Sequence, residues 1–440
     1  MKPAEKQNAR PALDGRLLLK QLEMLGEVGG DTTGREYGFP AGKRTRLALS
    51  DGDKTGRDLL VRWMKELDLK VRIDPIGNIF GVLSGEPSGT EELSGSNLEN
   101  ALMIGSHIDT VIDAGSLDGA YGVLSGLAVA RAFRNAGIQP RRPLVVAAFT
   151  NEEGVRFQPD MMGSLYFTGG ISIDEALDTI GIDGVRLGDE LNRIGYSGDA
   201  DPSLLIPKEY LELHVEQGPV LDSENLDIGV VEHLQGISWK RIEIAGTANH
   251  AGTTPVSMRH DAGYAAARVI VFLRELARSA ENTRTTVGSF RLQPDLINVI
   301  PSKAEFTVDM RDPDNSCLVE GERRLADFLV RLADEEGVTV LTEILARFDP
   351  VQFDKELADS IESSARKRGF TYKRMTSGAG HDAQMLARVC KSAMIFVPSK
   401  DGISHNPAEF TSEEHLLMGA QVLLDVAFDR LYAAHEIHAT

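Results

Sequence analysis

Four short clusters of histidines and carboxylates carry the side chains that could bind metal ions. They read Ser106-His107-Ile108-Asp109, Asn151-Glu152-Glu153-Gly154, Leu213-His214-Val215-Glu216 and Ser404-His405-Asn406-Pro407, and a further acid, Asp118, stands eleven residues after His107. Imidazole nitrogen and carboxylate oxygen are ligands of zinc and of the neighbouring divalent metals. Two such ions can share one bridging carboxylate and activate one water. The residue types therefore predict a site for two divalent metals.

The spacing within the clusters indicates a role for each acid. Asp118 lies between a tight turn and Gly119, which favours a rigidly held, bridging carboxylate. Glu152 and Glu153 are adjacent, so their side chains diverge; one can bind metal while the other takes a proton from the water as general base. Asp109 lies two residues after His107, and in an extended segment these two side chains share a face, so Asp109 could orient the imidazole.

Short apolar runs precede three of the clusters and predict strands that are buried on both faces. They span residues 101–104, 144–149 and 393–397, and a stretch with helical spacing covers 122–136. Alternating buried strands and helices predict a parallel sheet covered by helices, in which ligand sites lie beyond the carboxyl ends of the strands. Taken alone, such a histidine or acidic pair is more often a surface feature than a metal site. The metal hypothesis depends on all the clusters sharing one edge of the sheet.

The stretch between the third and fourth clusters has a different pattern. It predicts a strand, a helix, two strands, a helix and a strand, at residues 238–245, 262–276, 285–292, 303–311, 318–334 and 338–345. This β-α-β-β-α-β order is that of the ferredoxin-like unit. We therefore expect an α/β catalytic domain with a mostly parallel sheet, made of residues 1–230 and 348–440. An inserted α+β ferredoxin-like domain, residues 231–347, would interrupt it.

Composition excludes several classes of partner. The 440-residue chain has a formal net charge of −19 and a pI near 5.0, which argues against binding nucleic acid or an anionic membrane surface. No apolar run approaches the length of about eighteen residues that a transmembrane helix needs. Residues 1–15 lack the apolar core of a signal peptide, and two cysteines do not make a disulfide scaffold. We therefore expect a cytoplasmic protein.

The motifs together are similar to those of a known family. The segments 105–110 (GSHIDT), 117–119 (LDG), 149–154 (FTNEEG) and 214–218 (HVEQG) resemble the dinuclear-metal amidohydrolases of the M20 peptidase superfamily. The segments 249–255 (NHAGTTP), 377–383 (SGAGHDA) and 403–405 (ISH) resemble its hydantoinase/carbamoylase branch. The resemblance covers nearly the whole chain. It implies the same two-domain fold, with an inserted lid that carries the contact of a homodimer.

The resemblance implies a metal-binding or catalytic role for particular residues. One metal would be held by His107, Asp118 and His214, and the other by Asp118, Glu153 and His405. Glu152 would be the general base and Asp109 the orienting acid. Two divalent ions per subunit are expected, with zinc first and manganese, cobalt or nickel as alternatives.

The resemblance also implies which residues hold the substrate. They are Gln217, Asn298, Arg311 and the glycine-rich loop of Gly378, Ala379 and Gly380, together with His250, which would stabilise the oxyanion. Arg311 offers a bidentate fork for a carboxylate, although its sequence neighbours Asp309 and Asp312 are alternative partners. Because His250, Asn298 and Arg311 belong to the inserted domain, a complete site would require the domains to close.

The function implied is hydrolysis of the ureido C–N bond of an N-carbamoyl-L-amino acid, which releases ammonia, carbon dioxide and the amino acid. Allantoate amidohydrolase and β-ureidopropionase are alternatives within the branch, so the small-molecule substrate, a ureido or amide compound with a carboxylate, stays open. A dipeptidase or N-acyl deacylase of the superfamily is disfavoured by the lid residues. An inactive binding dimer is disfavoured because the expected ligands and Glu152 are all present.

Overall fold

The structure is a computed structural model that describes residues 10–30, 34–36, 39–41, 43–86, 98–280 and 282–432. The chain forms two compact units. Unit 1 comprises Met1–Glu232 and Phe353–Thr440, and unit 2 comprises His233–Gln352. Residues 1–9, on which the predicted location partly depends, lie outside the described residues. Within the described ranges, no helix combines the length and apolar character needed to cross a membrane.

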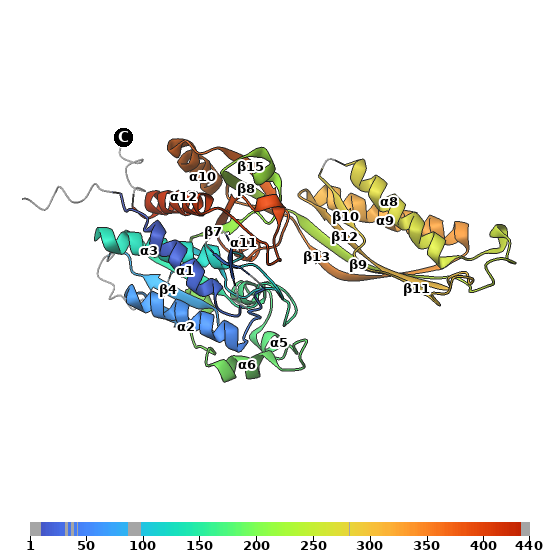
Figure 1. Cartoon of the computed structure of the whole chain (residues 1–440), viewed down its shortest axis with the longest axis horizontal. Helices are drawn as coiled ribbons and strands as arrows, with labels where there is room; N and C mark the ends of the chain where they lie inside the picture. The colour runs from blue at the N-terminus through green and yellow to red at the C-terminus, as the bar shows by residue number, and fades with distance from the viewer. Residues whose placement is uncertain are drawn as a thin grey trace, which may run out of the picture. The chain divides into compact units, whose positions relative to one another are not determined.

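A mixed sheet lies at the centre of unit 1 (Figure 1). Its strands are β3 (Lys70–Ile73), β4 (Ile79–Leu83), β5 (Leu102–His107), β6 (Leu144–Phe149), β7 (Glu209–Val215), β8 (Ile228–Leu234), β14 (Val351–Gln352), β15 (Tyr372–Ser377) and β16 (Lys391–Val397). They are ordered β14-β8-β16-β7-β5-β6-β4-β3, and β15 also pairs with β8. The four central strands β16, β7, β5 and β6 are parallel, whereas β3, β4, β8 and β14 pair antiparallel. The predicted α/β fold with a parallel central sheet is confirmed.

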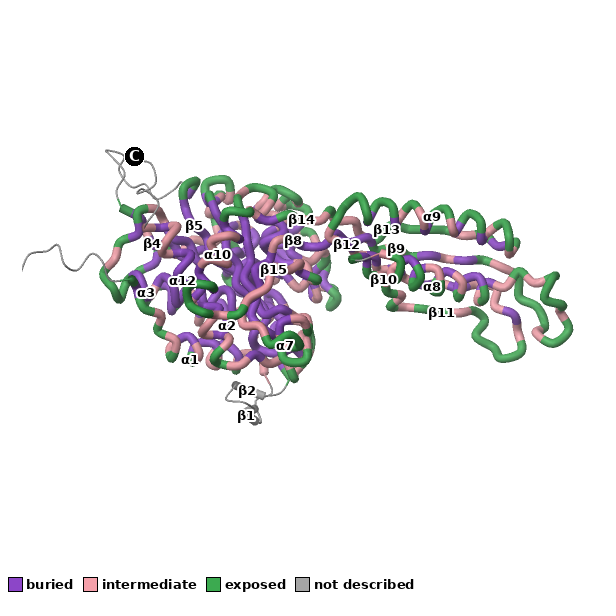
Figure 2. Tube along the Cα trace, turned by 90° about the horizontal axis from the view of Figure 1, so that it is seen from above, coloured by how far each residue is buried: buried purple, intermediate pink, exposed green. Residues whose placement is uncertain are grey.

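Helices pack on this sheet and bury its strands. The helices of unit 1 are α1 (Gly15–Gly26), α2 (Asp51–Glu66), α3 (Ala120–Ala136), α4 (Met162–Phe167), α5 (Ile173–Leu177), α6 (Leu187–Ile194), α7 (Val220–Glu224), α10 (Lys355–Arg368), α11 (Asp382–Leu386) and α12 (Glu413–Leu431). Strands β5, β6 and β7 are buried along their whole length (Figure 2). Their side chains are mostly aliphatic, and each fully buried one stabilises the fold by about 1.5–3 kcal/mol. The apolar runs in the sequence arise from this two-sided burial. A separate short pair, β1 (Gly34–Glu36) and β2 (Phe39–Ala41), is antiparallel.

The start of α3 brings the helix backbone close to a cluster histidine. Gly119, its N-cap, has φ +63°, a conformation that residues with a Cβ rarely adopt. A Cβ at this position would also lie 2.5 Å from the imidazole of His107. Glycine is therefore required for both reasons, and Asp118, the residue before this N-cap, lies just outside the helix.

Unit 2 is an antiparallel sheet with two helices packed against it. It contains β9 (Gly236–Ala245), α8 (Ala262–Arg278), β10 (Arg284–Thr286), β11 (Phe290–Gln293), β12 (Lys303–Asp312), α9 (Asn315–Glu336) and β13 (Thr339–Phe348). The strand order is β10-β12-β9-β13, with β11 also on β12, which is the ferredoxin-like arrangement. On β12 the side chains of Phe306, Val308 and Met310 face a core shared with both helices. The single strand expected at 285–292 is divided into β10 and β11 at residues 287–289.

Candidate metal centre

The cluster residues lie at the carboxyl ends of the parallel strands. His107 is the last residue of β5 and aligns with Phe149, the last residue of β6, so residues 150–153 continue past the same edge. His214 is next to last in β7 and aligns with Phe396 of β16. His405 follows β16 after a short 3-10 helix, Lys400–Gly402. The sheet edge predicted from the pattern of apolar runs is therefore the place where these side chains gather.

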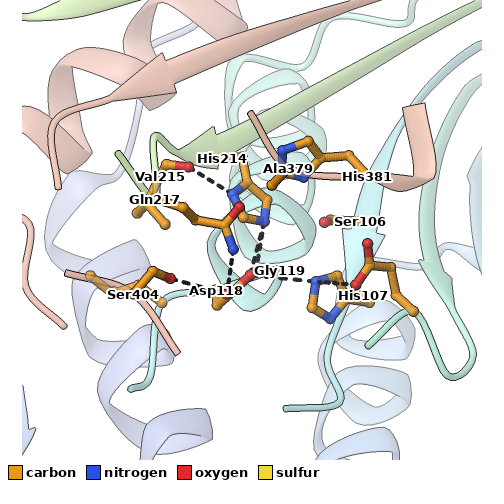
Figure 3. Close-up of polar contacts among 12 residues, drawn as sticks. Ser106, His107, Asp118, Gly119, His214, Val215, Gln217, Ala379, His381 and Ser404 are labelled. Atoms are coloured by element: carbon orange, nitrogen blue, oxygen red, sulfur yellow. Dashed lines mark hydrogen bonds and ion pairs between the residues drawn. The ribbon is translucent and has the colours of Figure 1, made fainter. Parts of the chain in front are cut away.

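Asp118 contacts histidines through both of its oxygens, and Figure 3 shows it between His107 and His214. Oδ1 lies 3.1 Å from His214 Nε2 and 3.6 Å from His107 Nε2. Oδ2 lies 3.2 Å from His405 Nε2, which is also 3.3 Å from Glu153 Oε2. Two of the groups that could each hold an ion contain Asp118: His107, Asp118 and His214 form one, and Asp118, Glu153 and His405 form the other. The two groups share a single carboxylate.

The distances and the donors fit divalent metal ions. Ligands bound at about 2.0–2.2 Å in a tetrahedral site lie roughly 3.3–3.6 Å from one another. The nitrogen–oxygen separations measured here run from 3.1 to 3.6 Å. Glu153 Oε1 is buried without a hydrogen-bond partner among the described residues, and a cation would satisfy it. The residues present are therefore suited to metal binding.

Main-chain carbonyls orient two of the imidazoles. The Nδ1 atom of His107 lies 3.0 Å from the Asp109 carbonyl oxygen, and that of His214 lies 2.8 Å from the Val215 carbonyl oxygen. Since a carbonyl only accepts, each Nδ1 carries the proton and donates it. Each Nε2 then faces the Asp118 side of the cluster, where a bound metal ion would take its lone pair in place of the proton shared with Asp118.

The carboxylate of Asp109 has different partners from the one its spacing suggests. Its Oδ1 accepts a hydrogen bond from the backbone N–H of Glu152, and its Oδ2 accepts one from the N–H of Glu153, both at 3.3 Å. Its distance to His107 Nδ1 is 3.6 Å, longer than the carbonyl contact of the same residue. Asp109 thus orients His107 chiefly through its main chain, while its side chain fixes the tandem glutamates.

The cluster contains more buried carboxylates than histidines, so the histidines cannot balance all of the negative charge. Burial opposes ionisation of Asp118, yet hydrogen bonds from His107, His214 and His405 hold its pKa well below the usual range. Burial, with the charge of Asp118, raises the pKa of Glu153 to about 8, and burial raises the pKa of Glu152 well above its usual value. The hydrogen bond to Asp118 raises the pKa of His405 to about 9. Several buried acids with raised pKa values are typical of a functional site that receives a cation.

Gln217 and the glycine-rich loop also border the cluster. Gln217 Nε2 donates to Asp118 Oδ2 at 2.8 Å, and its buried Oε1 has no hydrogen-bond partner in the described part of the chain. Gly378, Ala379 and Gly380 follow β15, and the next residue, His381, stacks edge-on against His214 with ring centroids 4.5 Å apart (Figure 3). The amide and the loop predicted to hold substrate thus lie beside the metal groups.

The other predicted substrate residues lie in unit 2. His250 pairs with Val299 across an isolated bridge, and the Asn298 carbonyl accepts from Ala251 N at 3.0 Å, so the His250 and Asn298 segments are neighbours. Nδ1 of His250 accepts from the N–H of Gly252 and of Thr253, which leaves Nε2 as the protonated, donating atom. Arg311 forms a fork to Asp309 with contacts of 2.9 and 3.0 Å, and Asp309 is one of the two alternative partners expected from the sequence.

Two polar residues close to Asp118, Ser404 and Glu409, had no role predicted from the sequence. Ser404 Oγ lies 3.3 Å from Asp118 Oδ2, and Glu409 accepts from the backbone N–H of Asp118. Ser404 adjoins a predicted ligand, which is a signal that could have identified it. Glu409 has no such signal, because it meets Asp118 across 291 residues of chain.

Comparison with known proteins agrees with this fold. Residues 103–429 match the model of Peptidase family M20/M25/M40. The chain is 37% identical over 391 residues to the N-carbamoyl-L-amino-acid amidohydrolase of Rhizobium meliloti, covering 88% of this chain and 92% of that protein. It is 33% identical to the allantoate amidohydrolase of Bacillus subtilis, covering 90% and 95% of the two chains. A crystal structure of a hydantoinase/carbamoylase family amidase from Burkholderia multivorans superposes with a TM-score of 0.87 at 38% identity, covering 95% of this chain and 98% of that one.

These matches define a class of hydrolases that act on C–N bonds, and the fold of unit 1 and unit 2 is the fold of that class. The chain belongs to the M20 peptidase family, in its hydantoinase/carbamoylase branch. The resemblance inferred from the motifs is confirmed.

Proposed function

We propose that the protein is a dinuclear-metal amidohydrolase that cleaves the ureido C–N bond of N-carbamoyl-L-amino acids. The observation that carries this proposal is the position of Asp118, whose two oxygens face two different ligand groups. A carboxylate in that position can bridge two ions. Similarity to the N-carbamoyl-L-amino-acid amidohydrolase of Rhizobium meliloti supports the choice of substrate.

In this proposal His107, Asp118 and His214 hold one ion, and Asp118, Glu153 and His405 hold the other. Histidine and carboxylate ligands without cysteine suit zinc, and they also accept manganese, cobalt or nickel according to supply. When bound, the metals would polarise the substrate carbonyl and lower the pKa of the attacking water.

Glu152 is the proposed general base. Its Oε2 lies 3.4 Å from His107 Nε2, at the border of the first ligand group but outside both. The hydrogen bond between its backbone N–H and Asp109 fixes its position. Glu152 would take a proton from the attacking water and deliver it to the departing nitrogen, because the ureido nitrogen leaves only when protonated.

The remaining polar side chains are proposed to bind the substrate. His250 Nε2–H would donate to the developing oxyanion, a contact whose loss commonly costs about 3 kcal/mol in transition-state stabilisation. Arg311 would exchange Asp309 for the substrate carboxylate, since both offer the same pair of oxygens to its fork. Asn298, Gln217 and the loop of Gly378, Ala379 and Gly380 would complete the contacts.

Allantoate is the second candidate substrate, favoured by the similarity to the Bacillus subtilis allantoate amidohydrolase. The test is a panel of metal-loaded reactions with N-carbamoyl-L-amino acids, N-carbamoyl-β-alanine, allantoate and dipeptides, followed by ammonia release and amino-acid analysis. We expect the highest kcat/KM with an N-carbamoyl-L-amino acid. Turnover of dipeptides alone would overturn the proposal, and highest turnover of allantoate would select the second candidate.

We also propose a homodimer formed through unit 2. β13 is the last strand in the order of the unit 2 sheet, and among the described residues it pairs only with β9. It exposes Leu341, Ile344 and Leu345 by 62%, 67% and 40%. A long, apolar edge strand is a template for pairing with another chain, and a second copy would cover it.

A further inference from the structure

Glu409 joins two segments of the metal centre that are far apart in the sequence. Its Oε1 accepts hydrogen bonds from the backbone N–H groups of Leu117, at 2.9 Å, and of Asp118, at 3.3 Å. Its Oε2 accepts one from the hydroxyl of Ser404 at 3.0 Å. One side chain therefore contacts the backbone of the bridging acid and the residue just before His405.

The hydroxyl of Ser404 completes a short chain of contacts. It lies 3.3 Å from Asp118 Oδ2 (Figure 3). His405 Nε2 approaches the same oxygen at 3.2 Å. Ser404 has one proton, and the shorter of its two contacts is to Glu409. Glu409 thus fixes both Asp118, which belongs to both ligand groups, and the segment that supplies His405 to the second.

The loop before Asp118 is packed directly against Glu409. A Cβ on Gly115 would lie 2.4 Å from Glu409 Oε1 and 2.5 Å from Glu409 Cβ, distances that real side chains do not adopt. On its other side the loop is held by backbone hydrogen bonds between Ala114 and Arg44, of 2.7 and 3.3 Å. Contacts on both sides leave little freedom for the backbone that carries Asp118.

From these contacts we propose that Glu409 is a positioning residue: it keeps Asp118 and the Ser404–His405 segment in the geometry that the two ligand groups need. Groups that orient metal ligands through hydrogen bonds typically contribute 10–100-fold to metal affinity, although they do not touch the ion. A carboxyl group suits this task because one of its oxygens can accept from the backbone of Leu117 and Asp118 while the other accepts from Ser404. The inference rests on the proposed metal-binding function.

The test measures the affinity of the full chain for Zn²⁺ by competition with a chromophoric chelator. Glu409→Ala is expected to weaken binding by 10–100-fold, and Ser404→Ala by less, because it removes one of the three contacts. Glu409→Gln keeps an oxygen for the two amides, and its Zn²⁺ affinity is expected to lie between those of wild type and Glu409→Ala.

The matched control is Asp227→Ala, because Asp227 Oδ2 likewise accepts from the N–H and hydroxyl of a distant residue, Thr371, outside the ligand groups. Its Zn²⁺ affinity is expected to equal that of wild type.

Thermal unfolding of the metal-free proteins separates positioning from general stability. A folded Glu409→Ala protein with wild-type Zn²⁺ affinity would overturn the proposal, as would equal affinity losses in Glu409→Ala and the Asp227→Ala control. If Glu409→Ala does not fold, wild-type affinity in both Glu409→Gln and Ser404→Ala would overturn it instead. Absence of Zn²⁺ binding by the wild-type chain would defeat the proposed function itself, whereas the other outcomes leave that function standing. The absorption spectrum of the Co²⁺-loaded variants reports ligand geometry independently of activity.

Discussion

Asp118 stands between two unequal environments. Its Oδ1 faces His107 and His214, whose side chains are almost fully buried, while its Oδ2 faces His405, whose side chain is 49% exposed. The first ligand group is therefore closed to solvent, and the second is open to it. Substrate and exchanging metal are expected to reach the second group first.

Replacing His405 tests whether the two groups bind separate ions. His405→Ala removes one ligand of the exposed group and leaves His107, Asp118 and His214 in place. We expect the metal content, measured by mass spectrometry of the purified protein, to fall from two ions per chain to one. Retention of two ions after dialysis against a weak chelator would contradict the proposed ligand assignment.

Replacing Glu152 tests whether it acts as the general base while the adjacent Glu153 binds metal. Glu152→Gln keeps the size of the side chain but cannot accept a proton, so kcat is expected to fall by about 10²–10⁴-fold. Metal content should stay at the wild-type value, because Glu152 lies outside both ligand groups. Ammonia release and metal analysis on the same sample provide the check, with the exposed Glu224→Gln as control. Equal turnover in Glu152→Gln and wild type would reject Glu152 as the base.

Single residues differed in how well the sequence predicted their surroundings. His107 was placed correctly because it follows a predicted buried strand, and strand ends in a parallel sheet meet at one edge. His214 lies at the same edge, although the apolar runs predicted no strand at 209–215. The partners of the Asp109 carboxylate were not predicted. Local spacing pointed to His107, but the fold brings the amides of Glu152 and Glu153 within hydrogen-bond distance from another strand.

At the scale of elements, a buried acid ties the start of β7 to α12. Glu209, the first residue of β7, is fully buried and pairs with Arg142 before β6 and with Arg430 near the end of α12. Removing one partner of a buried ion pair typically costs about 3–5 kcal/mol, because the other charges lose their compensation. We expect Glu209→Gln to lower the free energy of unfolding of unit 1 by about this amount at pH 7, measured by urea denaturation.

The effect of this substitution should depend on pH. Burial opposes ionisation, but the hydrogen bonds from Arg430 and Arg142 lower the pKa of Glu209 below its ordinary value. A lowered pKa means that the carboxylate stabilises the fold above the ordinary glutamate pKa, and that this contribution is lost as the pH falls through the lowered value. The difference between wild type and Glu209→Gln should therefore shrink in acid. The control is Glu343→Gln, whose exposed pair with Arg241 should contribute less than about 1 kcal/mol at any pH. If the difference in free energy of unfolding between wild type and Glu209→Gln does not change with pH, the argument is wrong.

The elements themselves were predictable where burial is two-sided. The run 144–149 coincides with β6, and the helix expected at 122–136 lies within α3. The direction of the flanking strands was not predictable, because an apolar run indicates burial and says nothing about orientation. β4 and β8 pair antiparallel with their neighbours, and only the tertiary path of the chain determines that. The division of 285–292 into β10 and β11 had a local signal in Gly288, which is unfavourable inside a strand.

At the scale of the whole molecule, the proposed dimer can be tested at the edge of β13. Replacing Leu341 and Ile344 together by lysine places charge on the edge strand, which disfavours pairing with a second copy. We expect the molar mass measured by light scattering to fall from that of a dimer to that of a monomer. The control replaces Val256 and Met258, which are also exposed in unit 2 but lie outside β13. A wild-type chain that is monomeric at micromolar concentration, or a double variant that stays dimeric, would reject this edge as the interface.

The chain enters and leaves unit 2 on two strands that pair with each other. β8 leads into it and β14 leads out, with His233 opposite Gln352 and Leu234 opposite Val351 in antiparallel register. Antiparallel neighbours of this kind can be joined by a two-residue turn such as Asn-Gly. A recombined gene could therefore exchange everything between residues 236 and 349 for a hairpin turn, or for the equivalent segment of a relative, without changing the strand order of unit 1. The cluster residues and the segment that carries His250, Asn298 and Arg311, three of the proposed substrate residues, are thus encoded separately, so that one continuous stretch of sequence could be exchanged without altering the cluster.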